Sequence, residues 1–305
     1  MRHVLEASRA PGRPLRTAAL TLLALVAFAG NSLLCRLALG EGTIDAASFA
    51  SLRLCSGALV LVALVAGQQG GARWRGAGSW GSALALFLYA VPFSFAYLSL
   101  TTGVGALVLF AAVQATMILA GIRSGERPRA LEWLGLVLAL GGLGVLARPG
   151  EMASPAPGLA SMALAGVAWG VYSLRGRGGE APVVATSGNF LRAAPLALLV
   201  SLALSPHAHL TVEGALLAVV SGALASGLGY VVWYAALRGL TATRAAVVQL
   251  AVPVLAAAGG VWLLNEAVTL RLLVASLLIL GGVGVALAAR WRLAPTAPAA
   301  VVAQP

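Results

Sequence analysis

The stretch that decides the fold starts at Glu126 and, after fourteen further residues, reaches the segment GGLGV at positions 141–145. The same arrangement returns 140 residues later, where Glu266 is followed by fourteen residues and then by GGVGV at positions 281–285. Because the two stretches agree in residue type, spacing and order, they indicate an internal duplication. The duplication divides the chain near residue 150 into two similar halves.

Composition places most of this chain in lipid rather than in water. Of its 305 residues, 60% are hydrophobic and 10% are charged, whereas a soluble domain carries roughly 25% charged residues. A membrane span needs about 20 mostly apolar residues, and ten segments meet this requirement. They cover residues 17–39, 46–66, 79–100, 103–122, 130–147, 157–175, 184–204, 213–236, 244–264 and 270–290. The sequence therefore predicts an all-α membrane protein with ten transmembrane helices.

The arginines predict which side of the membrane each connection faces. With the N-terminus in the cytoplasm, fifteen arginines lie on the cytoplasmic side and three on the opposite side, while Arg53 and Arg192 fall inside spans. All 20 basic residues are arginine, which indicates GC-rich coding and hence a bacterial protein. We therefore expect a multi-pass protein of the inner membrane with both termini in the cytoplasm.

Five helices in each half make the two halves cross the membrane in opposite directions. An odd number of spans ends on the side opposite to its start, so the second copy enters from the other side. We expect a first repeat in residues 1–150 and a second, inverted repeat in residues 156–293. Inverted repeats of this kind are typical of secondary transporters, whose substrate sites lie near the midplane between the halves.

Polar and aromatic residues within the spans are the candidates for lining a substrate cavity. An amide is unfavourable in hydrocarbon, so it should face protein or a wet cavity, although hydrogen bonds between helices alone would also satisfy it. Three of the aromatic candidates near helix ends have the aromatic belt at the membrane surface as an alternative. The candidates are Asn31, Tyr89, Tyr97, Gln114, Trp169, Tyr172, Tyr230, Trp233, Tyr234 and Gln249.

Arg53 and Arg192 occupy equivalent places, about eight residues into the second helix of each half. One interpretation is structural, with the side chains reaching toward the membrane surface and bonding to helix ends. The other is a gate or a contact for a substrate carboxylate. The sequence leaves both open.

The repeated glycines predict close packing of the last helix of each half. The three glycines within 141–144 and the three within 281–284 remove side-chain bulk where another backbone comes near. A hinge is the alternative interpretation.

The sequence lacks the residues that proton coupling, metal binding, ATP-driven pumping and catalysis usually require. No Asp or Glu lies at the centre of a span, and the three histidines are at positions 3, 207 and 209. Because proton-coupled carriers usually place an ionisable group in the membrane, we favour transport driven by the substrate gradient. Cys35 and Cys55 do not form a metal-binding pattern, no phosphate-binding Gly-Lys-Ser/Thr loop is present, and no catalytic cluster falls within the spans. We expect no cofactor, no metal and no enzymatic activity, and the scattered arginines disfavour nucleic acid.

From about residue 17 to 291, the chain resembles the EamA-type transporters of the drug/metabolite transporter superfamily. Both halves contribute motifs to the likeness, but the first half has Val113 where the second has Pro253. The motifs are Glu126 and Glu266, the two glycine runs, Arg53 and Arg192, Trp169-Gly170, Tyr97-x-x-Leu100 and Tyr234-x-x-Leu237. The resemblance implies ten helices, a central cavity between the halves, and export of amino acids, metabolites or drugs. Within the family, the chain looks most like bacterial exporters of aromatic and other neutral amino acids.

These observations together predict an exporter of small amphipathic metabolites, first of all aromatic and other neutral amino acids, that works by alternating access. Efflux of cationic drugs is one alternative, although a buried cation requires a counter-charge such as an acid in the middle of a span. A structural membrane subunit is another, and it would have no cavity. The expected partners are a small-molecule substrate and the lipid bilayer. The oligomeric state stays open, with a monomer as the working assumption.

Overall fold

The computed structural model describes residues 13–69, 76–123, 130–147, 155–176, 181–240 and 248–291. Regular structure in these residues is helical, apart from one isolated antiparallel bridge between Ile44 and Leu210. The first half comprises α1 (Arg13–Gly40), α2 (Ala46–Gln69), α3 (Trp80–Ala96), α4 (Thr102–Arg123) and α5 (Ala130–Ala147). The second comprises α6 (Ala156–Arg175), α7 (Pro182–Ala203), the short η1 (Ser205–His207), α8 (Val212–Val220), the π-helical η2 (Ser221–Leu228), α9 (Gly229–Leu237), α11 (Ala251–Leu264) and α12 (Leu270–Trp291).

The predicted all-α organisation and its ten helical segments are confirmed. Among the described residues, six helices are long and apolar enough to cross a membrane, and four further apolar helices are shorter. α8, η2 and α9 together form one of the six long segments, Val212–Leu237. The predicted segment 244–264 is described only from residue 248 onward, and Glu126 lies outside the described residues.

Local signals in the sequence account for several helix ends. The Ser79 side chain accepts a hydrogen bond from the Ser82 amide and begins α3, and Thr211 does the same for Gly214 at the start of α8. Asn265 ends α11 with a φ of 52°, a left-handed conformation that asparagine tolerates better than most residues. The chain can therefore turn sharply into the connection that carries Glu266.

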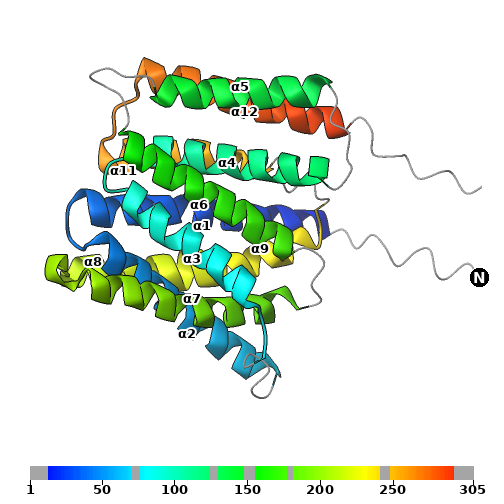
Figure 1. Ribbon diagram of the computed structural model, residues 1–305. Helices are drawn as coiled ribbons and strands as arrows, with labels where there is room; N and C mark the ends of the chain where they lie inside the picture. Colours follow the sequence, from blue (N-terminus) through cyan, green and yellow to red (C-terminus); the bar gives the residue numbers. More distant parts are fainter. Residues whose placement is uncertain are drawn as a thin grey trace, which may run out of the picture.

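The helices form a layered bundle in which they run roughly side by side (Figure 1). α5 packs against α12 as an outer layer, and α2 packs against α7 at the opposite edge. Between them, α4 contacts α6 and α11, α3 contacts α6, and α1 contacts α9 and α11. α1 begins and α12 ends at the same end of the bundle, which we call the terminal end (Figure 1). The opposite end, where α1 connects to α2 and α7 to α8, is the distal end.

Backbone hydrogen bonds join the two halves at the distal end. The Asp45 amide donates to the carbonyl of His209 at 3.0 Å, and the Thr211 amide donates to the carbonyl of Thr43 at 2.9 Å. The pair forms the antiparallel bridge at Ile44, whose side chain is fully buried. The α1–α2 connection is thereby attached to the α7–α8 connection.

Side-chain hydrogen bonds join the halves at the terminal end. Asn189 of α7 accepts from the Ser79 amide at 2.9 Å, and Arg175 of α6 donates to the Ser82 hydroxyl at 3.2 Å. Arg192 donates to the backbone carbonyl of Ala77. Contacts between the two halves are therefore present at both ends of the bundle in the described conformation.

The glycine runs pack closely at only one position each, which corrects the prediction for the others. A side chain at Gly142 would approach Ile279 to 2.7 Å, and one at Gly282 would approach the carbonyl oxygen of Gly135 to 2.5 Å. The remaining glycines of the two runs face open space within 4 Å: Gly141, Gly144, Gly281 and Gly284. The α5–α12 contact therefore needs one glycine per run.

Candidate functional site

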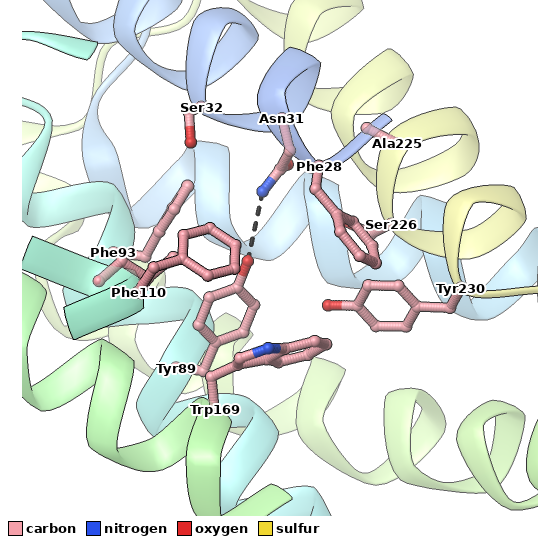
Figure 2. A pocket seen from close by; sticks show the side chains of 11 residues that line it. Phe28, Asn31, Ser32, Tyr89, Phe93, Phe110, Trp169, Ala225, Ser226 and Tyr230 are labelled. Carbon is pink, nitrogen blue, oxygen red and sulfur yellow. Dashed lines mark hydrogen bonds between the residues drawn. The ribbon is translucent and has the colours of Figure 1, made fainter. Parts of the chain in front are cut away.

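A small cavity lies in the centre of the bundle, where helices of both halves meet (Figure 2). The first half contributes α1, α3 and α4 to its wall, and the second contributes α6, η2 and α9. Its free volume is about 20 Å³, roughly what one water molecule requires. The lining residues are Phe28, Asn31, Ser32, Tyr89, Phe93, Leu109, Phe110, Trp169, Ala225, Ser226 and Tyr230. A solute of amino-acid size can therefore enter only after the wall has moved.

Trp169 lies at the centre of the aromatic part of this wall. Its ring centroid is 4.9 Å from that of Tyr89 and 5.1 Å from that of Tyr230. Tyr172, one turn further along α6, stacks on Trp169 at 5.5 Å with an interplanar angle of 26°. Figure 2 shows the indole spread across one side of the cavity, below the Tyr89 ring and opposite Tyr230. This arrangement offers a flat, polarisable surface on which an aromatic solute can stack.

Small residues on α6 bring Trp169 into this position. A side chain at Gly166 would lie 2.5 Å from the carbonyl oxygen of Leu109, and one at Gly170 would lie 2.9 Å from Thr116. Both neighbours belong to α4, so α6 can approach α4 closely only because these positions lack side chains. The Trp169-Gly170 pair thus combines the aromatic surface with the contact that places it.

A chain of hydrogen bonds forms the polar part of the wall. Asn31 donates to the Tyr89 hydroxyl at 3.3 Å and accepts from the Ser221 hydroxyl at 2.6 Å. Figure 2 shows the Asn31–Tyr89 bond, which joins α1 to α3 above the Tyr89 and Trp169 rings. The buried amide of Asn31 therefore has partners on two other helices, in accordance with the expectation that such a group faces protein or a cavity.

Arg53 lies directly behind this wall and is 1% exposed. Its Nε atom donates to Ser226 at 3.1 Å and an Nη atom donates to Tyr89 at 2.8 Å. Its guanidinium carbon also lies 4.8 Å from the ring centroid of Phe93. All three neighbours line the cavity, so Arg53 supports the wall from outside it.

The π-helical segment η2 forms the part of the wall that faces Arg53. Within it, a side chain at Gly222 would lie 2.1 Å from the carbonyl oxygen of Arg53, so the backbones of η2 and α2 are in close contact. The wider turn of this segment presents Ser221 to Asn31 and Ser226 to Arg53. π-Helical turns occur frequently at functional sites.

The structure brings four of the predicted cavity residues together and places a fifth just behind them. Asn31, Tyr89, Trp169 and Tyr230 line the cavity, and Tyr172 stacks behind Trp169.

The other five predicted residues do not line this cavity in the described conformation. Tyr97 is fully buried at the end of α3, and its hydroxyl is 3.5 Å from the Thr102 carbonyl. Trp233 packs against Phe28, and the Tyr234 hydroxyl is 3.5 Å from that of Thr186. Gln114 lines a second cavity of about 10 Å³ between α4, α5 and α12. Gln249 is buried ahead of α11.

The structure separates the two arginines that the sequence presents as equivalents. Arg192 donates to the backbone carbonyls of Ala77 and Gly188 and lies 6.0 Å from the Trp80 ring centroid, at the terminal end. It therefore anchors the end of the α2–α3 connection, whereas Arg53 reaches the wall of the central cavity.

Several cavity residues escaped prediction because nothing in the sequence marks them. Phe28, Phe93 and Phe110 are apolar residues in apolar helices, and the same composition occurs on lipid-facing surfaces. Ser226 is polar, but it belongs to a run of small residues that reads as a packing motif. Ser32, by contrast, is a polar residue next to Asn31 within the first span, so it belongs to the class that the sequence marks as cavity candidates.

Comparison with known proteins identifies the family. A protein of Pseudomonas aeruginosa, described as "Uncharacterized protein PA1977", is 53% identical over 277 residues, which cover 90% of this chain and 96% of that protein. The model of the EamA-like transporter family matches residues 156–288. This chain belongs to the EamA-like transporter family. The resemblance seen in the sequence motifs is confirmed.

A solved structure described as "Crystal structure of protein" shares the fold of this EamA-like transporter. Its TM-score is 0.64 at 24% identity, and the match covers 90% of this chain and 99% of the other. Membership of the EamA-like transporter family, together with six helices long and apolar enough to cross a membrane among the described residues, makes this chain a multi-pass membrane protein whose partners are a small-molecule substrate and membrane lipids.

Proposed function

We propose that this EamA-like transporter exports small amphipathic metabolites, first of all aromatic and other neutral amino acids. The observation that carries the proposal is the central aromatic cavity around Trp169. Tyr89 and Tyr230 approach Trp169 from α3 and α9, which belong to different halves of the chain. A solute held there would contact both halves at once, as alternating access requires.

The pattern of helix contacts supports two inverted five-helix repeats. Equivalent helices of the two halves contact each other in three pairs: α2 with α7, α4 with α11, and α5 with α12. The contact between α3 and α6 has its counterpart between α9 and α1. Exchanging the two halves leaves this set of contacts unchanged, as a pseudo-twofold axis would require.

The placement in the membrane follows from the arginines. We propose an inner-membrane location with the terminal end of the bundle facing the cytoplasm, because fifteen arginines then lie on the cytoplasmic side and three on the other. The start of α1 and the end of α12 share that end of the bundle (Figure 1).

Transport requires the contacts at the two ends to break in turn. In the proposed cycle, loss of the terminal contacts would admit the solute from the cytoplasm, and loss of the distal contacts would release it outside. The cavity of about 20 Å³ would widen during each opening. We further propose that the substrate gradient drives export, because the membrane spans contain no acid at their centres.

Transport into proteoliposomes tests the proposal. Purified protein should exchange labelled phenylalanine, tyrosine or tryptophan, and Trp169→Ala should lower the apparent affinity about 2- to 10-fold through loss of stacking. Trp169→Phe should retain part of this affinity, and Trp262→Ala should retain all of it because Trp262 is 82% exposed on α11.

Three results would each contradict a different part of the proposal. Unchanged transport by Trp169→Ala would remove Trp169 from the site, and absence of exchange for every amino acid would contradict the substrate class. Strict dependence of export on the proton gradient would contradict the proposal that the substrate gradient drives transport, and it would leave the proposed substrate class unaffected.

A further inference from the structure

Arg53 places a positive charge beside the central cavity. Its guanidinium is buried, and no carboxylate among the side chains that the structure describes lies within ion-pair distance of it. Arg36, by contrast, lies 3.5 Å from a carboxylate oxygen of Glu266. Because an arginine stays charged even when buried, Arg53 carries an uncompensated charge into the protein interior.

Within the part of the chain that the structure describes, two hydrogen-bond donors in this region have no partner. One terminal nitrogen of Arg53 is buried without a hydrogen bond, and so is the hydroxyl of Tyr230. Figure 2 shows the Tyr230 hydroxyl pointing into the cavity, toward the space between Tyr89 and Trp169. Buried polar groups are normally satisfied, so these two donors are free to bond to an acceptor that comes to lie beside them.

The other contacts of Arg53 compensate its burial only in part. The hydroxyls of Ser226 and Tyr89 accept two hydrogen bonds, and the Phe93 ring at 4.8 Å adds a cation–π contact. None of these neighbours is an anion. A carboxylate would supply both a hydrogen-bond acceptor and the opposite charge, and it matches the planar guanidinium better than any neutral group.

We propose that Arg53 is the carboxylate-binding group of the cavity, so that the substrate is an aromatic carboxylate whose ring stacks on Trp169. This inference rests on the proposed function and names the charged part of the substrate. Tyr89 and Ser226 both line the cavity and bond to Arg53, so displacement of these two side chains exposes the guanidinium to the solute.

The described residues around the cavity offer few acceptors for the substrate's amino group. Asn31 is the amide of the wall, and its oxygen already accepts from Ser221 at 2.6 Å. Without a described carboxylate at the cavity, an ammonium group has no counter-charge there. The site therefore requires the carboxylate of a substrate and tolerates the loss of its amine.

Inhibition of phenylalanine exchange by matched analogues tests this inference. Proteoliposomes loaded with unlabelled phenylalanine take up labelled phenylalanine in the presence of 3-phenylpropionate, phenylalaninamide or phenethylamine. The acid should compete at concentrations similar to those of phenylalanine, and the two analogues without a carboxylate should be weaker by about tenfold or more. Arg53→Gln should bring the acid and amide affinities close together, and Arg53→Lys should keep part of the difference.

Arg192→Gln is the matched control, because Arg192 occupies the equivalent position in α7 but donates to the backbone carbonyls of Ala77 and Gly188 at the terminal end. Its acid-to-amide ratio should equal that of the unmodified protein. If Arg53→Gln does not reconstitute, the analogue series on the unmodified protein decides the question alone. Equal inhibition by acid and amide, or an unchanged ratio in Arg53→Gln, would overturn the inference while leaving aromatic transport intact. Failure of phenylalanine and all analogues to bind would overturn both proposals.

Discussion

The carboxylate of Glu266 accepts a bifurcated hydrogen bond from the Thr102 amide, at 2.8 and 2.9 Å to its two oxygens, and another from the Thr102 hydroxyl at 3.0 Å. Thr102 is the first residue of α4, so an acid from the second half caps a helix of the first. A negative charge is favourable there because the helix N-terminus carries unpaired amides and a positive dipole. Gly260 leaves the necessary space, since a side chain there would lie 2.3 Å from a Glu266 oxygen.

Glu266→Gln keeps one acceptor oxygen but removes the negative charge at the start of α4, so it should destabilise the protein by about 0.3–2 kcal/mol, the range for a charge at a helix terminus. The change also removes the charge that faces Arg36. Thermal unfolding in detergent measures the effect. Glu213→Gln is the control, because Glu213 is also an acid in the first turn of a helix, α8, but is exposed. Equal unfolding temperatures for Glu266→Gln and Glu213→Gln would show that the Glu266 carboxylate does not stabilise the start of α4.

Gly282→Ala should destabilise the α5–α12 pair by about 1–3 kcal/mol, the usual range for overpacking. The new methyl group would lie 2.5 Å from the Gly135 carbonyl oxygen, and a backbone atom cannot move aside easily. Gly284→Ala is the matched control two residues away, where nothing lies within 4 Å. It should be neutral or slightly stabilising, because alanine favours the helix. Equal loss of stability in both variants would show that helix flexibility rather than packing needs these glycines.

A disulfide across the distal bridge should stop transport reversibly. Ile44 and Leu210 face each other in an antiparallel pair flanked by the Asp45–His209 and Thr211–Thr43 hydrogen bonds. Such pairs bring Cα atoms to about 4.5 Å, within the range that disulfides span. Ile44→Cys with Leu210→Cys, in a chain whose native cysteines are replaced by alanine, should lose exchange on oxidation and regain it on reduction. Full exchange in the oxidised protein would show that this end need not open.

Asp45 should make the distal end sensitive to acid. Its half-buried position opposes ionisation, but hydrogen bonds from Ser48 and from the His209 amide outweigh burial and lower the pKa of Asp45 below its ordinary value. The ionised carboxylate therefore stabilises the folded state above the ordinary pKa, and this stabilisation is lost as the pH falls through the lowered pKa.

The melting temperature should accordingly fall below about pH 4 more steeply in the native protein than in Asp45→Asn. Thermal unfolding at a series of pH values measures this difference. Parallel curves for the two proteins would contradict the assigned role of Asp45.

Long apolar segments separated by arginines and glycines made the helices predictable. The segment 130–147 was expected with the same bounds as α5, because a span of about 20 apolar residues leaves the chain little alternative to a helix. The third segment was drawn too long: α3 ends at Ala96, where the chain turns ahead of Thr102. Its apolar residues continue past the turn, so hydropathy alone does not mark the end.

Part of the candidate site was also predictable. Trp169, Tyr89 and Asn31 are aromatic or polar groups within spans, and such groups are costly to leave in lipid. Phe28 and Phe110 could not be predicted as cavity residues, because an apolar side chain is equally favourable against lipid and in a cavity wall. The sequence does not indicate the π-helical turn of η2 either, since its small residues are equally compatible with ordinary α-helix packing.

The sequence by itself determined that this chain is a bundle of apolar helices long enough to cross a membrane, because hydropathy acts along the chain and needs no partner. Only the tertiary structure decided which equivalent residues differ in role. Arg53 and Arg192 share a register in the two halves, yet one faces hydroxyls beside the cavity and the other faces backbone carbonyls at the terminal end. The physical reason is that a buried charge is defined by its neighbours, and those neighbours come from helices far away in the sequence.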